Sequence, residues 1–182
     1  MKIIKTFFED AYLIKSEVYK DSRGSFYVQY EEEQFSDLIG EKIYFSQDNV
    51  SVSNKFTLRG MHYQCNPYAQ DKLLTVLKGK IQDVCIDLRN NSPYFGEYFS
   101  VFMEEGDGLK LWIPKGFAHG FLSLEDTTIV HYKVNNKYDK DSERCITWDD
   151  KNLNIKWLHK DNIVLSKKDS DGNSFSIENE YF

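Results

Sequence analysis

The stretch Leu58-Arg59-Gly60-Met61-His62-Tyr63-Gln64 gathers a permanent cation, a titratable imidazole, a phenol and an amide around one glycine. Side chains alternate along an extended strand, which predicts that His62 and Gln64 share one face and that Arg59 lies on the other. A β-bulge at Gly60 would break this alternation and re-aim one of them, and such bulges are common beside active sites. The alternative is a half-exposed strand whose histidine and arginine are simply solvated.

The composition around this stretch favours a single all-β domain. The chain has 182 residues, which suffices for one domain with a substantial core. It contains 13 Phe, 12 Tyr and 3 Trp, and aromatic residues favour strands over helices. The formal net charge is -6 and there is no basic run, which argues against nucleic-acid binding. A small anionic ligand remains compatible with a few local Arg and Lys residues.

The cysteines predict neither a disulfide framework nor a zinc site. Cys65, Cys85 and Cys145 are odd in number and lie in no ligand-like spacing, so a reducing, cytoplasmic location is expected. Near the N-terminus, Glu9 and Asp10 interrupt the apolar run that a secretory signal needs. No stretch has the length and hydrophobicity of a membrane span, so no membrane partner is expected.

Local patterns predict strands at 12–18, 26–30 and 43–52 and one short helix at 31–39, which Gly40 closes as a left-handed cap. Residues 21–24 form a predicted turn between the first two strands. Strands 72–77 and 81–88 flank Lys78-Gly79-Lys80, which predicts a tight hairpin. In strand 129–134, Tyr132 shares the inward face with Val130 and Val134. Many short strands separated by turns indicate a jelly roll or barrel.

Taken in order, these residues resemble the dTDP-4-dehydrorhamnose 3,5-epimerase family of deoxysugar-nucleotide epimerases. The resemblance covers nearly the whole chain and rests on residues 21–26, 47–49, 58–64, 114–121, 132–133 and 165–169, with Lys72 and Tyr138. It implies a cupin-type jelly roll with a few short helices in one domain, 1–182. The core would span about residues 40–150, with N-terminal exchange strands and a C-terminal extension packed on it. It also implies a homodimer, no cofactor and no metal.

The resemblance implies the activity and four catalytic residues. The reaction would invert the carbons beside the ketone of a nucleotide-linked 4-keto-6-deoxyhexose, most simply dTDP-4-dehydro-6-deoxyglucose to dTDP-4-dehydrorhamnose. His62 would be the base, oriented by Asp169, and Tyr132 the acid on the opposite face of the sugar. An ordinary imidazole, with a pKa near ~6.5, can accept a proton at neutral pH, whereas a phenol near ~10 can donate one. Lys72 would stabilise the enolate oxygen.

The substrate-binding residues are also carried over from the resemblance. Arginine suits a diphosphate because its guanidinium can bond two phosphate oxygens at once. Arg23 and Phe26 would reach into the partner subunit's pocket, and Tyr138 would pack on the sugar face. The complete set is Arg23, Phe26, Gln47, Asn49, Arg59, His119 and Tyr138. His131, by contrast, is interpreted as structural.

Two positions depart from the family pattern. Val28 stands where the family usually has a glutamate near the nucleotide base, which leaves the base open. Lys167 replaces an aspartate two residues before Asp169, a change that is tolerable if Lys167 faces solvent.

Three alternatives stay open at this point. The first is an epimerase that inverts a single carbon of a different nucleotide sugar. The second is a metal-dependent cupin, although Tyr63 and Gln64 follow His62 where such proteins usually place a second histidine. The third is a non-catalytic sugar-nucleotide binding module, which would be expected to have lost His62, Tyr132 or Asp169.

Overall fold

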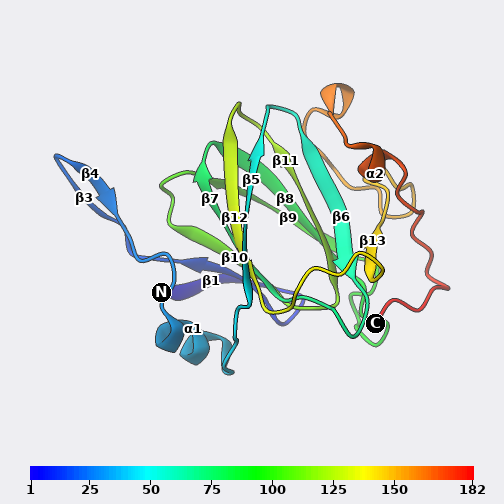
Figure 1. Cartoon of the computed structure of the whole chain (residues 1–182), viewed down its shortest axis with the longest axis horizontal. Helices are drawn as coiled ribbons and strands as arrows, with labels where there is room; N and C mark the ends of the chain where they lie inside the picture. Colours follow the sequence, from blue (N-terminus) through cyan, green and yellow to red (C-terminus); the bar gives the residue numbers. More distant parts are fainter.

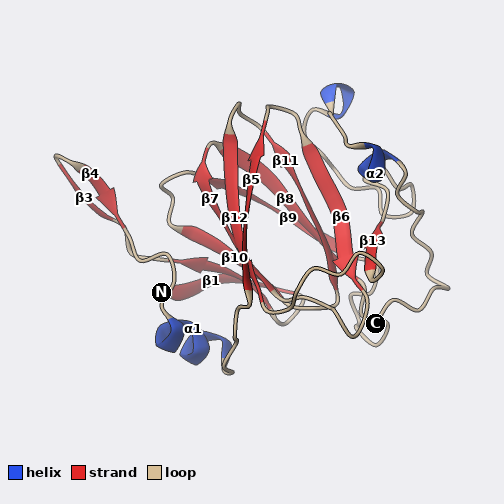
Figure 2. Cartoon of the chain, viewed as in Figure 1, coloured by secondary structure: helices blue, strands red, loops and turns tan.

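The computed structural model describes residues 1–182, and antiparallel strands dominate it (Figures 1 and 2). The larger sheet has the order β1-β2-β10-β7-β12-β5, and the second has the order β13-β6-β11-β8-β9. The strands of the larger sheet are β1 (Lys2–Phe7), β2 (Ala11–Lys15), β10 (Leu109–Ile113), β7 (Lys72–Lys78), β12 (Thr128–Val134) and β5 (Gln47–Ser53). Those of the second are β13 (Glu143–Cys145), β6 (Leu58–Gln64), β11 (Phe117–Ser123), β8 (Lys80–Asp87) and β9 (Tyr98–Glu104).

The remaining elements lie outside these two sheets. They are the hairpin of β3 (Tyr19–Asp21) and β4 (Gly24–Phe26), helix α1 (Glu32–Ile39), a 3-10 turn (Lys160–Asn162) and helix α2 (Lys167–Ser170). The fold is a cupin-like jelly roll, as predicted. β1 and β2 belong to the larger sheet, so the sheet begins well before residue 40. None of the helices has the length and hydrophobicity required to cross a membrane.

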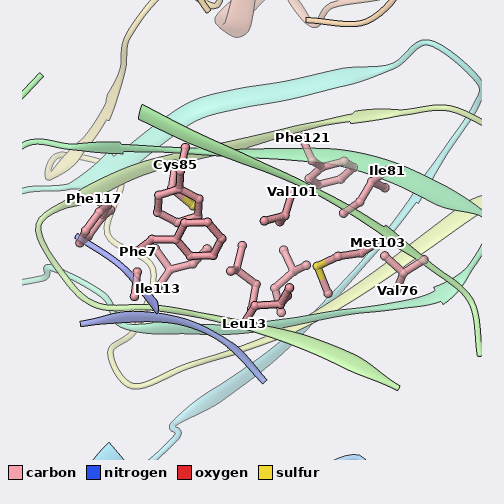
Figure 3. Packing of buried hydrophobic residues seen from close by; sticks show 14 of the residues in the cluster. Phe7, Leu13, Val76, Ile81, Cys85, Val101, Met103, Ile113, Phe117 and Phe121 are labelled. Carbon is pink, nitrogen blue, oxygen red and sulfur yellow. The ribbon is translucent and has the colours of Figure 1, made fainter. Parts of the chain in front are cut away.

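The outer face of each sheet is covered in part, which explains why the central strands β7, β8 and β11 are buried almost throughout rather than alternating. Between the sheets, side chains such as Leu74, Val130 and Phe121 form the largest core cluster (Figure 3). The C-terminal segment packs Trp157 and Phe175 against the outer face of the second sheet. Because the core fixes the two sheets against each other, side chains at their open end are held at defined positions.

Helix α1 covers the outer face of the larger sheet. Its fully buried Phe35 packs edge-on against Trp112 of β10, with ring centroids 5.3 Å apart. The Glu31 carboxylate caps the N-terminus by accepting from the N–H groups of Glu33 and Gln34, and Gly40 ends the helix with φ 84°. This confirms the predicted helix and its left-handed glycine cap.

Three local predictions are wrong, in whole or in part. The sequence Lys78-Gly79-Lys80 is not a hairpin turn, because β7 lies in one sheet and β8 in the other. Gly79 instead makes a corner between sheets, with φ 77° and with its N–H donating to Glu105. The predicted strand at 26–30 ends at Phe26, and the strand predicted at 12–18 ends at Lys15. The turn at 21–24 does connect β3 and β4.

The β3–β4 hairpin projects away from the two sheets (Figure 1). All six residues of its two strands are exposed. β5 forms one edge of the larger sheet, where it pairs only with β12. Val50 and Val52 on β5 are 63% and 58% exposed, so this sheet edge leaves apolar side chains uncovered.

Candidate active site

A cavity of about 540 Å³ opens between the two sheets, and its lining is mostly polar. Strands of both sheets supply the walls, and the C-terminal segment supplies one rim. Nine predicted site residues line it: Gln47, Asn49, Arg59, His62, Lys72, His119, Tyr132, Tyr138 and Asp169. The solvated-strand alternative for β6 is therefore wrong, because its polar side chains face a cavity.

A bulge in β6 brings Arg59 and His62 to the same cavity although they would not share a face in a regular strand. His119 of β11 pairs with His62 and Phe121 pairs with Arg59, so β6 carries one extra residue between the pairs. Gly60 permits this because a Cβ there would lie 2.5 Å from the Gly120 Cα, and its φ is 137°. The glycine therefore re-aims a side chain, as the bulge alternative predicts.

His62 and Asp169 form a close pair at the cavity wall. His62 Nε2 lies 2.5 Å from Asp169 Oδ1, and Ser166 Oγ donates to Asp169 Oδ2 at 2.9 Å. Burial raises the pKa of the Asp169 carboxyl, but the hydrogen bonds from His62 and Ser166 outweigh it, and the net pKa is lowered. Asp169 is therefore an ionised acceptor, so His62 carries its hydrogen on Nε2 and leaves Nδ1 able to accept a proton.

Tyr132 enters the cavity from the facing sheet. It pairs with Asn49 of β5 on one side and with Leu74 of β7 on the other. Burial raises the pKa of its phenol above 10.0, and the nearby Arg59 only partly opposes this. The phenol is consequently protonated at neutral pH and is available as a proton donor. His131, its neighbour on β12, lies outside the cavity lining.

Lys72 lies inside the cavity. Its position at the start of the predicted strand 72–77 suggests instead a place near the cavity mouth. The residue is only 8% exposed, and its ammonium donates to the His62 carbonyl at 3.4 Å. Burial lowers its pKa to about 8, and the neighbouring Cys85, Asp83 and Glu143 oppose that change. At neutral pH Lys72 is still mainly a cation, held in a water-poor environment where its field is strong.

A second histidine–aspartate pair adjoins Lys72. His119 Nε2 lies 2.9 Å from Asp83 Oδ2, and Asp83 is fully buried. The two residues come from neighbouring strands, β11 and β8. His119 lines the cavity, so its ring is fixed there by a carboxylate that a ligand cannot reach.

Sequence reasoning missed part of the rim. Glu143 of β13 accepts a hydrogen bond from the Tyr138 hydroxyl at 3.0 Å and forms an ion pair with Lys168 at 2.6 Å. Ser166 and Lys168 line the cavity beside Asp169, where the 165–169 motif offered a signal for them. Gln64, Gln70 and Glu143 also line it. No sequence pattern marks Glu143 as a cavity residue, because only the pairing of β13 with β6 brings it to the cavity.

Arg23 and Phe26 do not reach this cavity within one chain. They lie on the projecting β3–β4 hairpin, where the Arg23 guanidinium is bonded to Asp21 at 2.6 Å. Val28, the departure near the expected nucleotide-base position, is 40% exposed. Lys167 is exposed, so the second departure leaves Asp169 and its partners intact.

Comparisons with known proteins identify the family of the chain. The family model described as dTDP-4-dehydrorhamnose 3,5-epimerase matches residues 5–176. A relative of that name from Shigella flexneri is 43% identical over 100% of this chain and 99% of its own length.

Two crystal structures of relatives have the same fold. The Bacillus anthracis dTDP-4-dehydrorhamnose 3,5-epimerase with TDP and PPi bound is 41% identical, covers 96% of this chain and 99% of its own, and superposes with a TM-score of 0.92. A Legionella pneumophila dTDP-6-deoxy-D-glucose-3,5-epimerase in complex with dTDP-4-keto-L-rhamnose is 38% identical, with a TM-score of 0.91 and coverage of 95% and 92%. The present chain belongs to the dTDP-4-dehydrorhamnose 3,5-epimerase family.

Proposed function

We propose that the protein converts dTDP-4-dehydro-6-deoxyglucose to dTDP-4-dehydrorhamnose by inverting both carbons beside the ketone. The observation that carries this is the placement of His62 and Tyr132 in strands of facing sheets, β6 and β12, across one cavity. A sugar held between them meets a proton acceptor on one face and a proton donor on the other. Inversion requires that arrangement, because the proton must leave and return on opposite faces.

His62 starts the reaction. Its Nδ1 takes the proton from a carbon beside the ketone, and the electron pair of that C–H bond moves to the ketone oxygen to give an enolate. The imidazolium that forms is stabilised by Asp169, 2.5 Å from Nε2. The Lys72 ammonium stabilises the negative oxygen, an interaction that strengthens as the charge develops.

Tyr132 completes the reaction by donating its phenolic proton to the same carbon from the other face. The raised pKa of the phenol keeps that proton in place until the enolate forms. Solvent then returns a proton to Tyr132, and His62 loses its extra proton. Every step moves protons and no step changes an oxidation state, so the chemistry needs no electron carrier.

Polar groups near the β5 edge hold the nucleotide diphosphate in this proposal. Arg59 is anchored by bonds to Ser53 Oγ at 3.0 Å and to the Val52 carbonyl at 3.2 Å, which leaves the remaining guanidinium hydrogens for phosphate. Gln47 and Asn49 are bonded to each other at 2.7 Å and line the same wall. Tyr138 packs on the sugar at the rim. The TDP bound to the Bacillus relative and the dTDP-4-keto-L-rhamnose bound to the Legionella relative support thymine as the base.

Deuterium incorporation tests the reaction. The protein is incubated with dTDP-4-dehydro-6-deoxyglucose in deuterated water, and the product is analysed by mass spectrometry and proton NMR. Both ring carbons beside the ketone should gain deuterium and both should be inverted. Deuterium at one carbon only would replace this proposal with a single-carbon epimerase. No exchange with this or any other nucleotide-linked keto sugar would refute epimerase activity altogether.

We further propose a homodimer in which the β3–β4 hairpin of each chain completes the partner's site. Two three-residue strands with every residue exposed cannot form a stable sheet by themselves, so the hairpin requires a docking surface. The β5 edge offers one, because Val50 and Val52 are exposed and line the cavity mouth. Docking there would bring Arg23 and Phe26 to the nucleotide.

Subunit mixing tests this arrangement. Arg23→Ala and His62→Asn should each lose most activity, because each damages both sites of its own dimer. A mixed dimer has one site with neither change, so random mixing should restore about a quarter of wild-type activity. Absence of recovery, with mixed dimers verified by native mass spectrometry, would place Arg23 in the site of its own chain. A stable monomer by sedimentation would refute the dimer itself.

A further inference from the structure

We propose that Cys145, together with His62 and Asp169, forms an inhibitory site for a thiophilic divalent cation, with Zn²⁺ as the best fit. One imidazole nitrogen, one thiol sulfur and one carboxylate oxygen from these residues lie within 4.8 Å of one another. The reaction proposed above uses only two of them. Cys145 has no part in that chemistry, and its sequence spacing shows no metal motif.

The position of Cys145 follows from strand register. Cys145 is the last residue of β13 and pairs directly with His62 of β6, so both side chains project from the same face of the second sheet. Asp169 reaches that face from α2, which packs against β6. Three segments that are far apart in the sequence therefore deliver one N, one S and one O ligand atom to one point.

The ligand set and spacing suit zinc. Zn²⁺ binds Cys sulfur at about 2.3 Å and His nitrogen or carboxylate oxygen at about 2.0–2.2 Å in tetrahedral geometry, which puts ligand atoms roughly 3.3–3.7 Å apart. The His62–Asp169 contact must open from 2.5 Å, and Cys145 must close in from at most 4.8 Å. Rotations of these side chains supply shifts of that size. His62 and Asp169 line the open cavity, from which a water molecule can supply the fourth ligand.

The surroundings support a bound cation. Ser166 Oγ donates to Asp169 Oδ2 at 2.9 Å, so it orients the carboxylate and leaves Oδ1 for the metal. The Lys168 ammonium, a neighbouring positive charge that opposes a bound cation, is already paired with Glu143 at 2.6 Å. The His62 side chain is 27% exposed and lines the open cavity, which gives an entry path.

Zn²⁺ bound at Nε2 would prevent His62 from acting as a base. The Nε2 hydrogen moves to Nδ1, since a neutral imidazole bound to a metal through one nitrogen carries its hydrogen on the other. Nδ1 then becomes a donor and cannot accept the substrate proton. The Cys145 thiol gives up its proton to solvent on coordination, so neutral His62 and ionised Asp169 bind one Zn²⁺ with release of one proton.

Metal binding is tested first without substrate, so that it does not depend on the proposed reaction. Co²⁺ replaces Zn²⁺ as a spectroscopic probe, and a thiolate ligand gives an intense near-ultraviolet charge-transfer band. We expect the band, with one Co²⁺ bound per chain, in the wild type and in Cys65→Ser. Cys65 is the matched control because it is half-buried, directly follows β6 and lies outside the cluster. Cys145→Ser should lack the band.

Inhibition is the second measurement, and it rests on the proposed epimerase function. Micromolar Zn²⁺ should inhibit turnover, and a chelator should reverse the effect. Cys145→Ser and Cys145→Ala should need at least about tenfold more Zn²⁺ for half-inhibition, each measured against its own uninhibited rate, whereas Cys65→Ser should match the wild type. Equal inhibition of all four proteins would overturn the proposal, as would a cobalt–thiolate band that persists in Cys145→Ser. A band without any turnover would instead refute the proposed function.

Discussion

Two histidine–aspartate pairs border the same cavity, and they are built differently. His62 meets Asp169 across 107 residues of sequence, from strand β6 to helix α2. His119 meets Asp83 across two neighbouring strands of one sheet. The side-chain exposures are 27% and 5% for the first pair, and 10% and 0% for the second.

The difference shows that a histidine–aspartate contact does not by itself identify a base. The His62 imidazole is accessible enough to contact a substrate carbon. Its partner carboxylate, that of Asp169, comes from the short helix α2 at the rim. The second pair has its carboxylate sealed in the core beside Lys72, so its charge acts on the cavity without entering it. We therefore assign proton transfer to the first pair and electrostatic support to the second.

The largest expected effect is that of removing the accessible imidazole. His62→Asn should abolish both deuterium exchange and epimerisation, because no enolate forms without a base. His131→Asn is the matched control, since His131 lies on β12 outside the cavity and should leave the rate unchanged. Near-normal turnover in His62→Asn would refute the catalytic assignment and favour the binding-module alternative.

The second-largest effect is expected from removing the negative charge of Asp169. Asp169→Asn should lower the exchange rate by roughly three to four powers of ten, because the amide no longer fixes the tautomer or stabilises the imidazolium. Asp171→Asn, an exposed change in the same segment, is the control. If Asp83→Asn caused the larger loss at neutral pH, the roles of the two pairs would have to be exchanged.

Tyr132→Phe tests whether the His62–Asp169 pair transfers protons on only one face of the sugar. The variant keeps the base, so exchange at the abstracted position should continue with return of the proton to its original face. Net inversion should fall by roughly two to four powers of ten, the usual contribution of a positioned acid. Deuterium NMR and product analysis separate the two rates. Equal losses of exchange and inversion in a folded variant would contradict the placement of acid and base on opposite faces.

The sequence predicted most of the features that follow from side-chain alternation along a strand, from local caps or from the family resemblance. Tyr132 lines the cavity because period-two alternation in β12 puts it on the inner face with Val130. The helix α1 was predictable because its glycine cap is a local signal. The ordered motifs predicted the family, and nine of the side chains that they assigned to the site line the cavity.

The remainder depends on long-range pairing that no local pattern encodes. A glycine turn between two strands looks the same whether the strands pair or diverge into two sheets, so Gly79 was misread as a hairpin. Glu143 and Cys145 reach the site only because β13 pairs with β6. Asp83 carries no motif, and its contact with His119 follows from the pairing of β8 with β11.

The smallest expected effect concerns Lys72 and tests the electrostatic role of the second pair. Its pKa is about 8, lowered by burial, so the ammonium loses its proton as the pH rises through that value. Because the enolate oxygen needs the charged form, kcat/KM should decrease about tenfold per pH unit above about 8, as expected for loss of one proton. The Tyr132 phenol does not cause this limb, since its pKa is raised above 10.0.

Asp83 should control where that alkaline limb falls. Cys85, Asp83 and Glu143 all oppose the lowering of the Lys72 pKa by burial, and the Asp83 carboxylate is the larger of the two carboxylate contributions. Asp83→Asn should therefore move the limb to lower pH while the low-pH plateau changes little. Asp48→Asn, on the exposed side of β5, should leave the limb in place. An unmoved limb in folded Asp83→Asn would mean that the second pair only positions His119, and that the charge on Lys72 is maintained by Glu143 instead.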